Sequence, residues 1–221
     1  MIIDCISDLH GYYPQLEGGD LLIIAGDLTK RDHPIEHLDF IDWCRYLPYR
    51  KIIVIAGNHD NFIQTLKSKY FAMPVYHDHC EYLCDSGIEF EGLKIWGSPW
   101  SKTFQGMNPK CKAFTVDTEE DLASKFSLIP EDTDILITHT PPYGILDGIP
   151  LEDGSEYHTG STALLDALDR IKPKLLVFGH IHEQGGKKIL FKHHGPNTVC
   201  VNTSYVNANY QPVNKPIRII L

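Results

Sequence analysis

The sequence predicts an α/β sandwich, and two features of its apolar pattern favour this fold class. Short runs rich in β-branched residues alternate with segments of helical spacing early in the chain, and further short runs cluster late. Alternation alone would fit one doubly wound sheet, so the late clustering is what favours a sandwich. A length of 221 residues is enough for one sizeable core, and we predict a single domain over residues 1–221.

The early elements follow one another as strand, strand, helix and strand. Ile2–Ile6 has the length and composition of a strand. Leu21–Ala25 and Ile52–Ala56 are almost continuously apolar, which is typical of strands buried on both faces. Between them, Pro34–Leu47 has helical spacing and begins with a proline, which suits the first turn of a helix. The apolar residues of this helix recur at every third position: Ile35, Leu38, Ile41, Cys44 and Leu47.

The later part of the chain is richer in strands and turns. Turn signals surround the strand-like segments at Glu81–Leu83 and Ile88–Trp96. Asp134–Thr138 is a further buried strand, and Ser161–Ile171 is a helix with one leucine-rich face. Four more strands are predicted at Lys174–Phe178, Lys187–Phe191, Thr198–Val201 and Pro216–Leu221.

Composition and charge limit the class of protein. The formal net charge of −9 argues against broad binding to nucleic acid or to an anionic membrane, although bound metal ions can still attract a small phosphate substrate. No apolar run approaches the roughly 20 residues that span a bilayer, and the apolar start is too short for a signal peptide. We therefore expect a cytoplasmic protein whose six cysteines are reduced thiols.

Polar side chains follow five of the predicted strands at the point where each strand ends. They are Asp8 and His10 after the first strand, Asp27 after the second, Asn58, His59 and Asp60 after the third, His139 after Asp134–Thr138, and His180 and His182 after Lys174–Phe178. Ligands of α/β sheets gather outside the carboxyl ends of strands, so these side chains are expected to meet. Each motif alone fits an ordinary turn, but five such strand ends are not expected by chance.

The residue types and spacings at these strand ends favour a metal site. Asp8 and His10 are two residues apart, as are His180 and His182, and residues two apart in extended backbone project to the same side. Mixed Asp, Asn and His ligation suits divalent Mn, Fe, Co, Ni or Zn. Two such ions about 3.5–4 Å apart can clamp a phosphate and activate a water between them.

The motif set resembles that of the calcineurin-like metallophosphoesterases. The resemblance rests on Asp8-Leu9-His10, Gly26-Asp27, Gly57-Asn58-His59-Asp60, His139 and Gly179-His180-Ile181-His182, and it covers nearly the whole chain. It implies a four-layer α-β-β-α sandwich with two mixed sheets. Further segments, such as Gly97-Ser98-Pro99-Trp100 and His158-Thr159-Gly160, resemble one subgroup, the metallophosphoesterase-domain-containing brain proteins and their microbial relatives. Members of that subgroup are described as metal-dependent phosphodiesterases, some of which act on cyclic nucleotides.

The resemblance also implies a role for each residue. Asp8, His10 and His182 would bind the first metal ion, Asn58, His139 and His180 would bind the second, and Asp27 would bridge both. His59 would lie beside the scissile phosphate without binding metal, and Asp60 would orient His59 or support its charge. We favour Mn among the metals that this ligand set accepts.

The predicted function is hydrolysis of a small phosphodiester by in-line attack of a metal-bridging water or hydroxide. The alternatives are a phosphomonoesterase or broad phosphatase, and a non-catalytic scaffold that binds a nucleotide. His158 and Trp100 are candidate substrate contacts, with Phe104 as a third, although Trp100 and Phe104 also fit a packed loop. Two further histidine pairs, in His77-Asp78-His79 and in His193-His194, are expected to be solvated.

Overall fold

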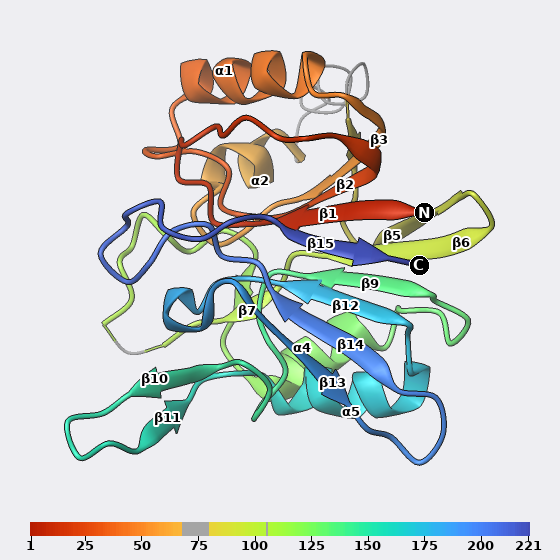
Figure 1. Ribbon diagram of the computed structural model, residues 1–221. Coiled ribbons are helices and arrows are strands. Elements are labelled where there is room, and N and C mark those ends of the chain that lie inside the picture. Colours follow the sequence, from red (N-terminus) through yellow and green to blue (C-terminus); the bar gives the residue numbers. More distant parts are fainter. Residues whose placement is uncertain (68–79, 105) are drawn as a thin grey trace.

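The protein folds into four layers, as the computed structural model in Figure 1 shows. The structure describes residues 1–67, 80–104 and 106–221. Helices α1 (Pro34–Arg45) and α2 (Asn61–Lys67) cover one sheet, and helices α4 (Glu119–Phe126) and α5 (Thr162–Ile171) cover the other. The two sheets pack face to face between the helices, so the predicted four-layer sandwich with two mixed sheets is confirmed.

Both sheets are mixed, with a parallel centre. The first has the order β15 (Ile217–Ile220), β1 (Ile2–Ile6), β2 (Gly19–Ala25), β3 (Tyr49–Ile55) and β4 (Glu81–Tyr82), and only β15 is antiparallel to its neighbour. The second has the order β13 (Lys187–Phe191), β14 (Thr198–Asn202), β12 (Leu175–Phe178), β9 (Ile135–Thr138), β6 (Leu93–Ser98) and β5 (Ser86–Phe90), with antiparallel strands at its two edges.

The apolar strands are buried on both faces because each face meets a different layer. In β2, Leu22 and Ile24 pack against α1, whereas Leu21 and Ile23 face the second sheet. The strands of the second sheet alternate in the same way, between the first sheet and helices α4 and α5. This arrangement explains why the apolar runs of the sequence are nearly continuous.

Helix α1 begins at Pro34, as predicted, but the row of apolar residues at every third position is not its buried face. Ile35 and Leu38 are 60% and 57% exposed, while His37 and Phe40 are buried with Ile41 and Cys44. Three residues advance by about 300°, less than one full turn, so such a row winds around the helix instead of following one side.

Several short elements were not predicted. They are α2, α4, the parallel pair β7 (Ser101–Lys102) and β8 (Thr115–Val116), the hairpin β10 (Gly148–Pro150) and β11 (Glu156–His158), and the 3-10 turn η1 (His182–Gln184). Thr118 caps α4, and an acidic first turn follows it, which is a signal the sequence did carry. The side-chain amide of Gln184 donates to the carbonyl of Gly148, so the β10–β11 hairpin is anchored on η1.

All six cysteines are free thiols in the structure, in agreement with the prediction. Within the described ranges, we find no helix with the length and apolarity needed to cross a membrane.

Candidate metal centre

The polar strand ends converge at one edge of the sandwich, where the backbone turns sharply after each strand. Asp8, His10, Asp27 and His180 all have positive φ angles, of 50°, 44°, 55° and 69°. Residues other than glycine rarely adopt this conformation, and it is concentrated at functional sites. These turns aim side chains from strands of both sheets into one region.

Glycines allow these turns to approach one another closely. A Cβ atom on Gly57 would lie 2.2 Å from Oδ1 of Asp27, and a Cβ atom on Gly179 would lie 2.0 Å from Oδ2 of Asp8. Neither distance is possible for real atoms, so any side chain at these positions would displace an aspartate.

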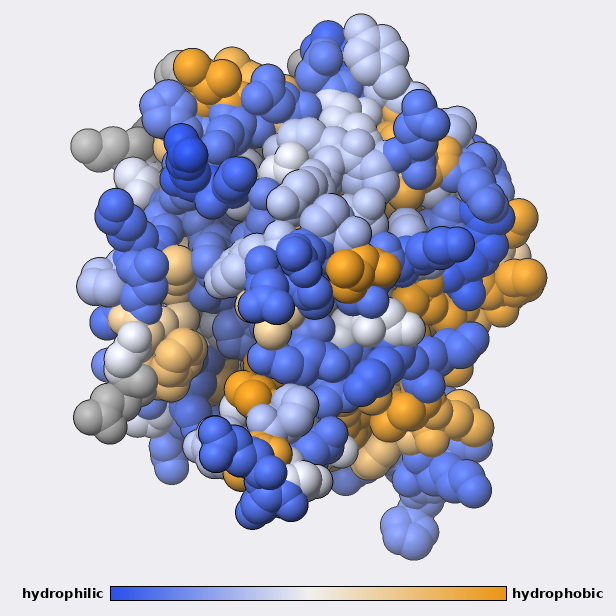
Figure 2. All heavy atoms as spheres, turned by 60° about the vertical axis from the view of Figure 1, so that its left-hand side comes forward, coloured by the Kyte–Doolittle hydropathy of each residue, from blue (hydrophilic) through white to orange (hydrophobic). Residues whose placement is uncertain are grey.

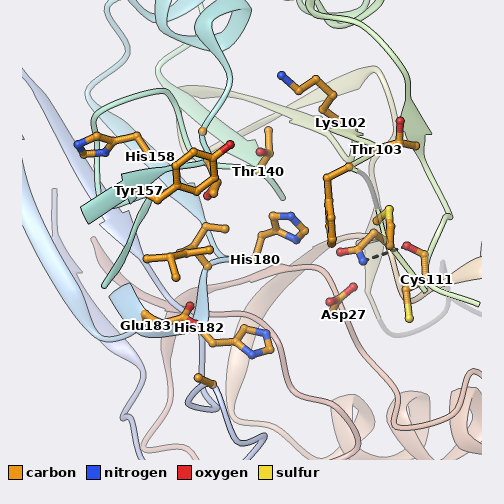
Figure 3. Close-up of a pocket in the computed structure, with 18 of the residues that line it drawn as sticks. Asp27, Lys102, Thr103, Cys111, Thr140, Tyr157, His158, His180, His182 and Glu183 are labelled. Carbon is orange, nitrogen blue, oxygen red and sulfur yellow. Dashed lines mark hydrogen bonds between the residues drawn. The ribbon is translucent and has the colours of Figure 1, made fainter. Parts of the chain in front are cut away.

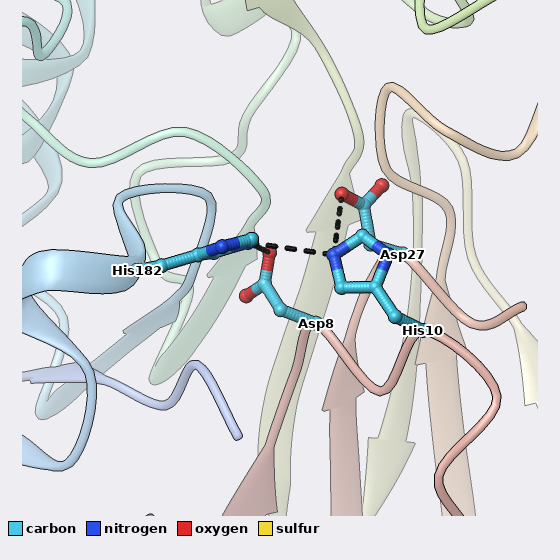
Figure 4. A group of neighbouring side chains, drawn as sticks. All are labelled: Asp8, His10, Asp27 and His182. Carbon is cyan, nitrogen blue, oxygen red and sulfur yellow. Dashed lines mark hydrogen bonds and ion pairs between the residues drawn. The ribbon is translucent and has the colours of Figure 1, made fainter. Parts of the chain in front are cut away.

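One group of four side chains has the geometry of a metal site. Potential ligand atoms of Asp8, His10, Asp27 and His182 all lie within 4.8 Å of one another (Figure 4). Nε2 of His182 lies 3.2 Å from Oδ1 of Asp8, and Nε2 of His10 lies 3.7 Å from Oδ2 of Asp27. Carboxylate oxygens and imidazole nitrogens from distant parts of the chain thus surround one point.

A second group meets the other oxygen of Asp27. Nε2 of His139 lies 3.5 Å from Oδ1 of Asp27 and 3.0 Å from Oδ1 of Asn58. The ring of His180 makes an edge contact with that of His139, at 4.9 Å between centroids. Asp27 therefore stands between two groups, and each of its oxygens faces one of them.

Asp8 is held by hydroxyl groups that the sequence did not indicate. Its Oδ2 accepts hydrogen bonds from Ser7 Oγ at 2.6 Å and Ser204 Oγ at 2.7 Å, and the backbone N–H of His180 also donates to this carboxylate. Ser204 lies 196 positions from Asp8 in the chain, so no local motif connects the two residues. Such partners fix the orientation of a potential metal ligand.

The carboxylate of Asp60 is bonded to the backbone of two turns. Asp60 is fully buried and accepts hydrogen bonds from the backbone N–H groups of Gly57 (2.7 Å), Asp27 (3.0 Å) and Leu28 (3.1 Å). It ties the turn after β2 to the turn after β3. Asp60 therefore holds the turn that carries Asp27, and its expected role toward His59 stays a prediction.

His59 lies at the border of the two groups and lines the adjacent cavity. Its Nε2 is 3.8 Å from Oδ2 of Asp27, its Nδ1 is 3.5 Å from the sulfur of Cys111, and its side chain is 22% exposed. Cys111 was not indicated by the sequence pattern. Its carbonyl also accepts a hydrogen bond from the side-chain amide of Asn58.

The electrostatics of the cluster suit a cation. Burial by itself would raise the pKa values of Asp8 and Asp27, but the neighbouring imidazoles of His182 and His139 hold them well below the usual range. Burial lowers the pKa of His10 to about 4 and that of His180 to about 3. At neutral pH, ionised carboxylates therefore face the uncharged imidazoles of His10 and His180, each of which has a free lone pair.

His139 and His182 differ from these two imidazoles, because the carboxylates of Asp27 and Asp8 raise their pKa values. Burial acts to lower the pKa of His139, but the charge of Asp27 outweighs burial and raises the pKa to about 9. A divalent cation at this position would take the place of that proton. The carboxylate oxygens, amide oxygen and imidazole nitrogens of the two groups are thus ligand types that bind divalent metal ions.

A cavity of about 790 Å³ opens beside the cluster. In Figure 3, Tyr157 and His158 lie on one side, Lys102, Thr103 and Cys111 lie on the other, and His180 and Asp27 lie between them. Figure 2 views the molecule from this side, where the surface is largely hydrophilic with separate hydrophobic patches. The cavity is much larger than one phosphate group requires.

Two of the three candidate substrate contacts line the cavity, and the third does not. His158 and Phe104 line the cavity, and Phe104 is 60% exposed instead of packed in a loop. Trp100 is not among the cavity residues. Its indole N–H donates to Asp85 at 2.7 Å and its ring contacts Phe114, so we assign Trp100 to packing.

The two other histidine pairs lie outside this centre. His194 is exposed, but the expectation of a solvated side chain is wrong for His193. The imidazole of His193 is buried between Asp169 and Thr198, at 2.7 Å and 2.9 Å, and it links α5 to β14. His77, Asp78 and His79 lie outside the described residues.

The four-layer sandwich with aspartate, asparagine and histidine at its strand ends is the architecture of a metallophosphoesterase. The family model for calcineurin-like phosphoesterases matches residues 1–184, and the chain belongs to that family. Its members are hydrolases of phosphoric esters that use a dinuclear divalent metal centre.

Relatives and solved structures agree with this assignment. Metallophosphoesterase domain-containing protein 1 of Homo sapiens is 38% identical over an alignment of 240 residues that covers 98% of this chain and 70% of the relative. The Mus musculus protein of that name has the same values. The crystal structure of TT1561 of Thermus thermophilus has a TM-score of 0.59 at 16% identity and covers 92% of this chain and 90% of its own. That structure is evidence of the shared fold alone.

Proposed function

We propose that this chain hydrolyses small phosphodiesters, such as cyclic nucleotides, with two divalent metal ions. The observation that carries the proposal is the position of Asp27. One of its oxygens faces His10 and His59, and the other faces His139. A carboxylate between two groups of ligands is what a pair of closely spaced ions requires.

The ligand sets follow from the two groups. Asp8, His10 and His182 would hold the first ion, Asn58, His139 and His180 would hold the second, and Asp27 would serve both. When bound, such ions supply Lewis acidity and lower the pKa of a water molecule. Carboxylate and amide oxygens mixed with imidazoles suit Mn²⁺, which we favour as the metal of this protein.

Two polar groups of the chain are proposed to act on the ester itself. His59 donates a proton to the leaving oxygen or a hydrogen bond to the phosphate, because it borders the centre without being needed as a ligand. On one side of the cavity, His158 offers its Nε2 to an anionic oxygen of the substrate. Nδ1 of His158 is 2.7 Å from Oδ1 of Asp147, a carboxylate that is 1% exposed.

The size and lining of the cavity support a diester substrate. A diester carries two organic groups on phosphorus, and the cavity extends from the metal cluster to aromatic side chains at Phe104, Tyr143 and Tyr157. Aromatic rings beside a phosphate site favour a planar substituent, such as a nucleobase, through stacking. We regard residues 1–221 as one catalytic unit, since both sheets contribute to the centre.

An activity screen tests the proposed function. The purified chain, loaded with Mn²⁺ and analysed for metal content, should hydrolyse bis-(p-nitrophenyl) phosphate and a cyclic nucleotide at least about tenfold faster than p-nitrophenyl phosphate. A preference for the monoester would instead identify a phosphomonoesterase. Tight nucleotide binding without turnover of any ester would identify a non-catalytic scaffold.

A substitution of Asp147 tests the proposed role of His158. Oδ2 of Asp147 accepts the N–H groups of Gly144 and Gly160 at 3.0 and 2.9 Å, and Asp147→Asn can keep those bonds through its amide oxygen. Its NH2 group would then face Nδ1 of His158, so the imidazole would take the other tautomer and lose its charge. KM for an anionic substrate should rise about tenfold with little change in kcat, as expected for an interaction that is equal in ground and transition states.

The pH dependence gives this test a second readout. The hydrogen bond with Asp147 raises the pKa of His158, so the charged form is present below that pKa and is lost as pH rises through it. KM of the wild type should therefore increase with pH, and in Asp147→Asn the increase should occur at lower pH. Asp153→Asn, in the exposed turn of the same hairpin, is the matched control. Unchanged KM and an unchanged pH profile would remove His158 from the substrate site.

A further inference from the structure

Tyr210 lies over the first group of proposed ligands and is not one of the residues assigned to either ion. Its ring makes edge contacts with His10 and His182, with centroids 4.8 and 5.1 Å apart, and lies 6.3 Å from the ring of His59. It also lines the cavity, and the residue is 47% exposed. A single phenol therefore contacts two proposed metal ligands, lies near the proposed acid and lines the open cavity.

The backbone holds Tyr210 in this place at a conformational cost. Its φ angle is 58°, in the left-handed region that residues other than glycine rarely adopt. The turn closes through the N–H of Tyr210, which donates to the carbonyl of Asn207 at 2.8 Å, and through the side chain of Asn207, which accepts from Gln211 N–H at 3.0 Å. Such strain persists where the surrounding structure enforces it, and this is common at functional sites.

The turn is fixed relative to Asp8. The backbone N–H of Tyr205 donates to the carbonyl of Ser7 at 2.9 Å, and the N–H groups of Val213 and Asn214 both donate to the carbonyl of Tyr205. The side chain of Asn214 donates to the carbonyl of Ser204 at 2.8 Å. Both ends of the turn are thus bonded to the segments that hold Asp8, which gives Tyr210 a defined position at the site.

The hydroxyl of Tyr210 is available for a ligand. Throughout the described residues it has no protein hydrogen-bond partner, although its ring contacts those of His10 and His182. A phenol is a neutral O–H donor at working pH, so it can bind a phosphate oxygen without adding positive charge beside the metal ligands. Packing alone would be served equally well by phenylalanine, which lacks this donor.

We propose that Tyr210 donates a hydrogen bond to a non-bridging oxygen of the substrate phosphate, on the side of the centre formed by His10 and His182. This inference rests on the proposed phosphoesterase function and adds a catalytic residue to it. The donor is placed in advance by the strained turn, so it need not reorganise during the reaction. Its contribution is expected to grow as negative charge accumulates on the phosphate oxygens in the transition state.

Tyr210→Phe is the decisive variant, because it removes one oxygen atom and keeps the ring contacts. Its kcat for bis-(p-nitrophenyl) phosphate should fall by about ten- to a hundredfold, in the range of a lost donor to a developing oxyanion. Metal content and thermal midpoint should match the wild type. Binding of inorganic phosphate to the Mn²⁺-loaded protein, measured by calorimetry, should weaken severalfold. Tyr46→Phe, at an exposed tyrosine beyond the end of α1, is the control.

A second variant separates the hydroxyl from the ring. Glycine adopts positive φ without strain, so Tyr210→Gly should keep the turn and lose both groups. If the glycine and phenylalanine variants lose kcat to a similar extent, the hydroxyl carries the effect. If Tyr210→Phe keeps wild-type kcat and phosphate affinity, or loses metal together with activity, the proposal is overturned. An inactive wild type would instead refute the phosphoesterase function itself.

Discussion

Asp27→Asn is expected to abolish loading of both metal ions and to lower kcat/KM by at least about a thousandfold, since metal catalysis supplies several kcal/mol of transition-state stabilisation. The amide keeps the shape of the side chain, and its oxygen can still accept the N–H of His59, now at 2.9 Å from Oδ1 of Asp27. It lacks the negative charge that faces His10 on one side and His139 on the other. The substitution therefore removes the shared anionic ligand with little change in packing.

Elemental analysis after gel filtration, together with kinetics at saturating Mn²⁺, measures this result. Thermal unfolding in EDTA distinguishes loss of metal from loss of fold, because both proteins are then compared without ions. Asp39→Asn, at an exposed position on α1, should retain metal and activity. Retention of two ions per chain by Asp27→Asn would show that Asp27 is not the bridging ligand.

His59→Gln should have the opposite pattern, with metal retained and turnover lost. General acid or base groups contribute about 10²–10⁴-fold, and we expect a loss in that range with both ions still bound. We expect this result because of where His59 lies relative to the proposed metal ligands. Nε2 of His59 lies 3.8 Å from Oδ2 of Asp27, and its side chain is partly exposed at the cavity. Five of the proposed ligands are instead buried: Asp8, His10, Asp27, Asn58 and His139.

The leaving group of the substrate provides a stricter test of proton donation by His59. An ester whose leaving group is a good anion, such as p-nitrophenolate, needs less protonation than an alkoxide. The loss in His59→Gln should therefore be larger for a cyclic nucleotide than for bis-(p-nitrophenyl) phosphate. His194→Gln is the matched control at an exposed histidine. Equal losses for the two substrates would assign His59 to charge stabilisation instead of proton donation, and loss of metal would make it a ligand.

The sequence predicted the strands and the polar strand ends because both are local signals. Runs such as Leu21–Ala25 are apolar over their whole length, and the motifs that follow them sit at fixed positions along the chain. The layer that each face meets is not a local property. The apolar run does not indicate that Leu22 and Ile24 pack against a helix, whereas Leu21 and Ile23 pack against the second sheet.

The parts of the centre that could not be predicted depend on contacts between distant segments. Ser204 supports Asp8 only because β14 ends beside β1, where Ser7 and Ser204 pair. The position of Tyr210 over His10 has the same origin, since its turn is bonded to Ser7 through Tyr205. Asp60 shows that adjacency in the chain does not by itself predict which groups a side chain contacts. It is adjacent to His59 in the chain, yet its carboxylate serves the backbone of another turn.

Each proposed ion takes ligands from both sheets. Asp8, His10 and Asn58 follow strands of the first sheet, and His139, His180 and His182 follow strands of the second. Bound ions would thus cross-link the two sheets. The contact between the sheets otherwise consists mainly of apolar packing, which has no directional preference. Sliding of one sheet along the other would pull ligands away from both ions at once. Metal binding would therefore fix the position of one sheet relative to the other. The same binding step would set the geometry of the catalytic centre.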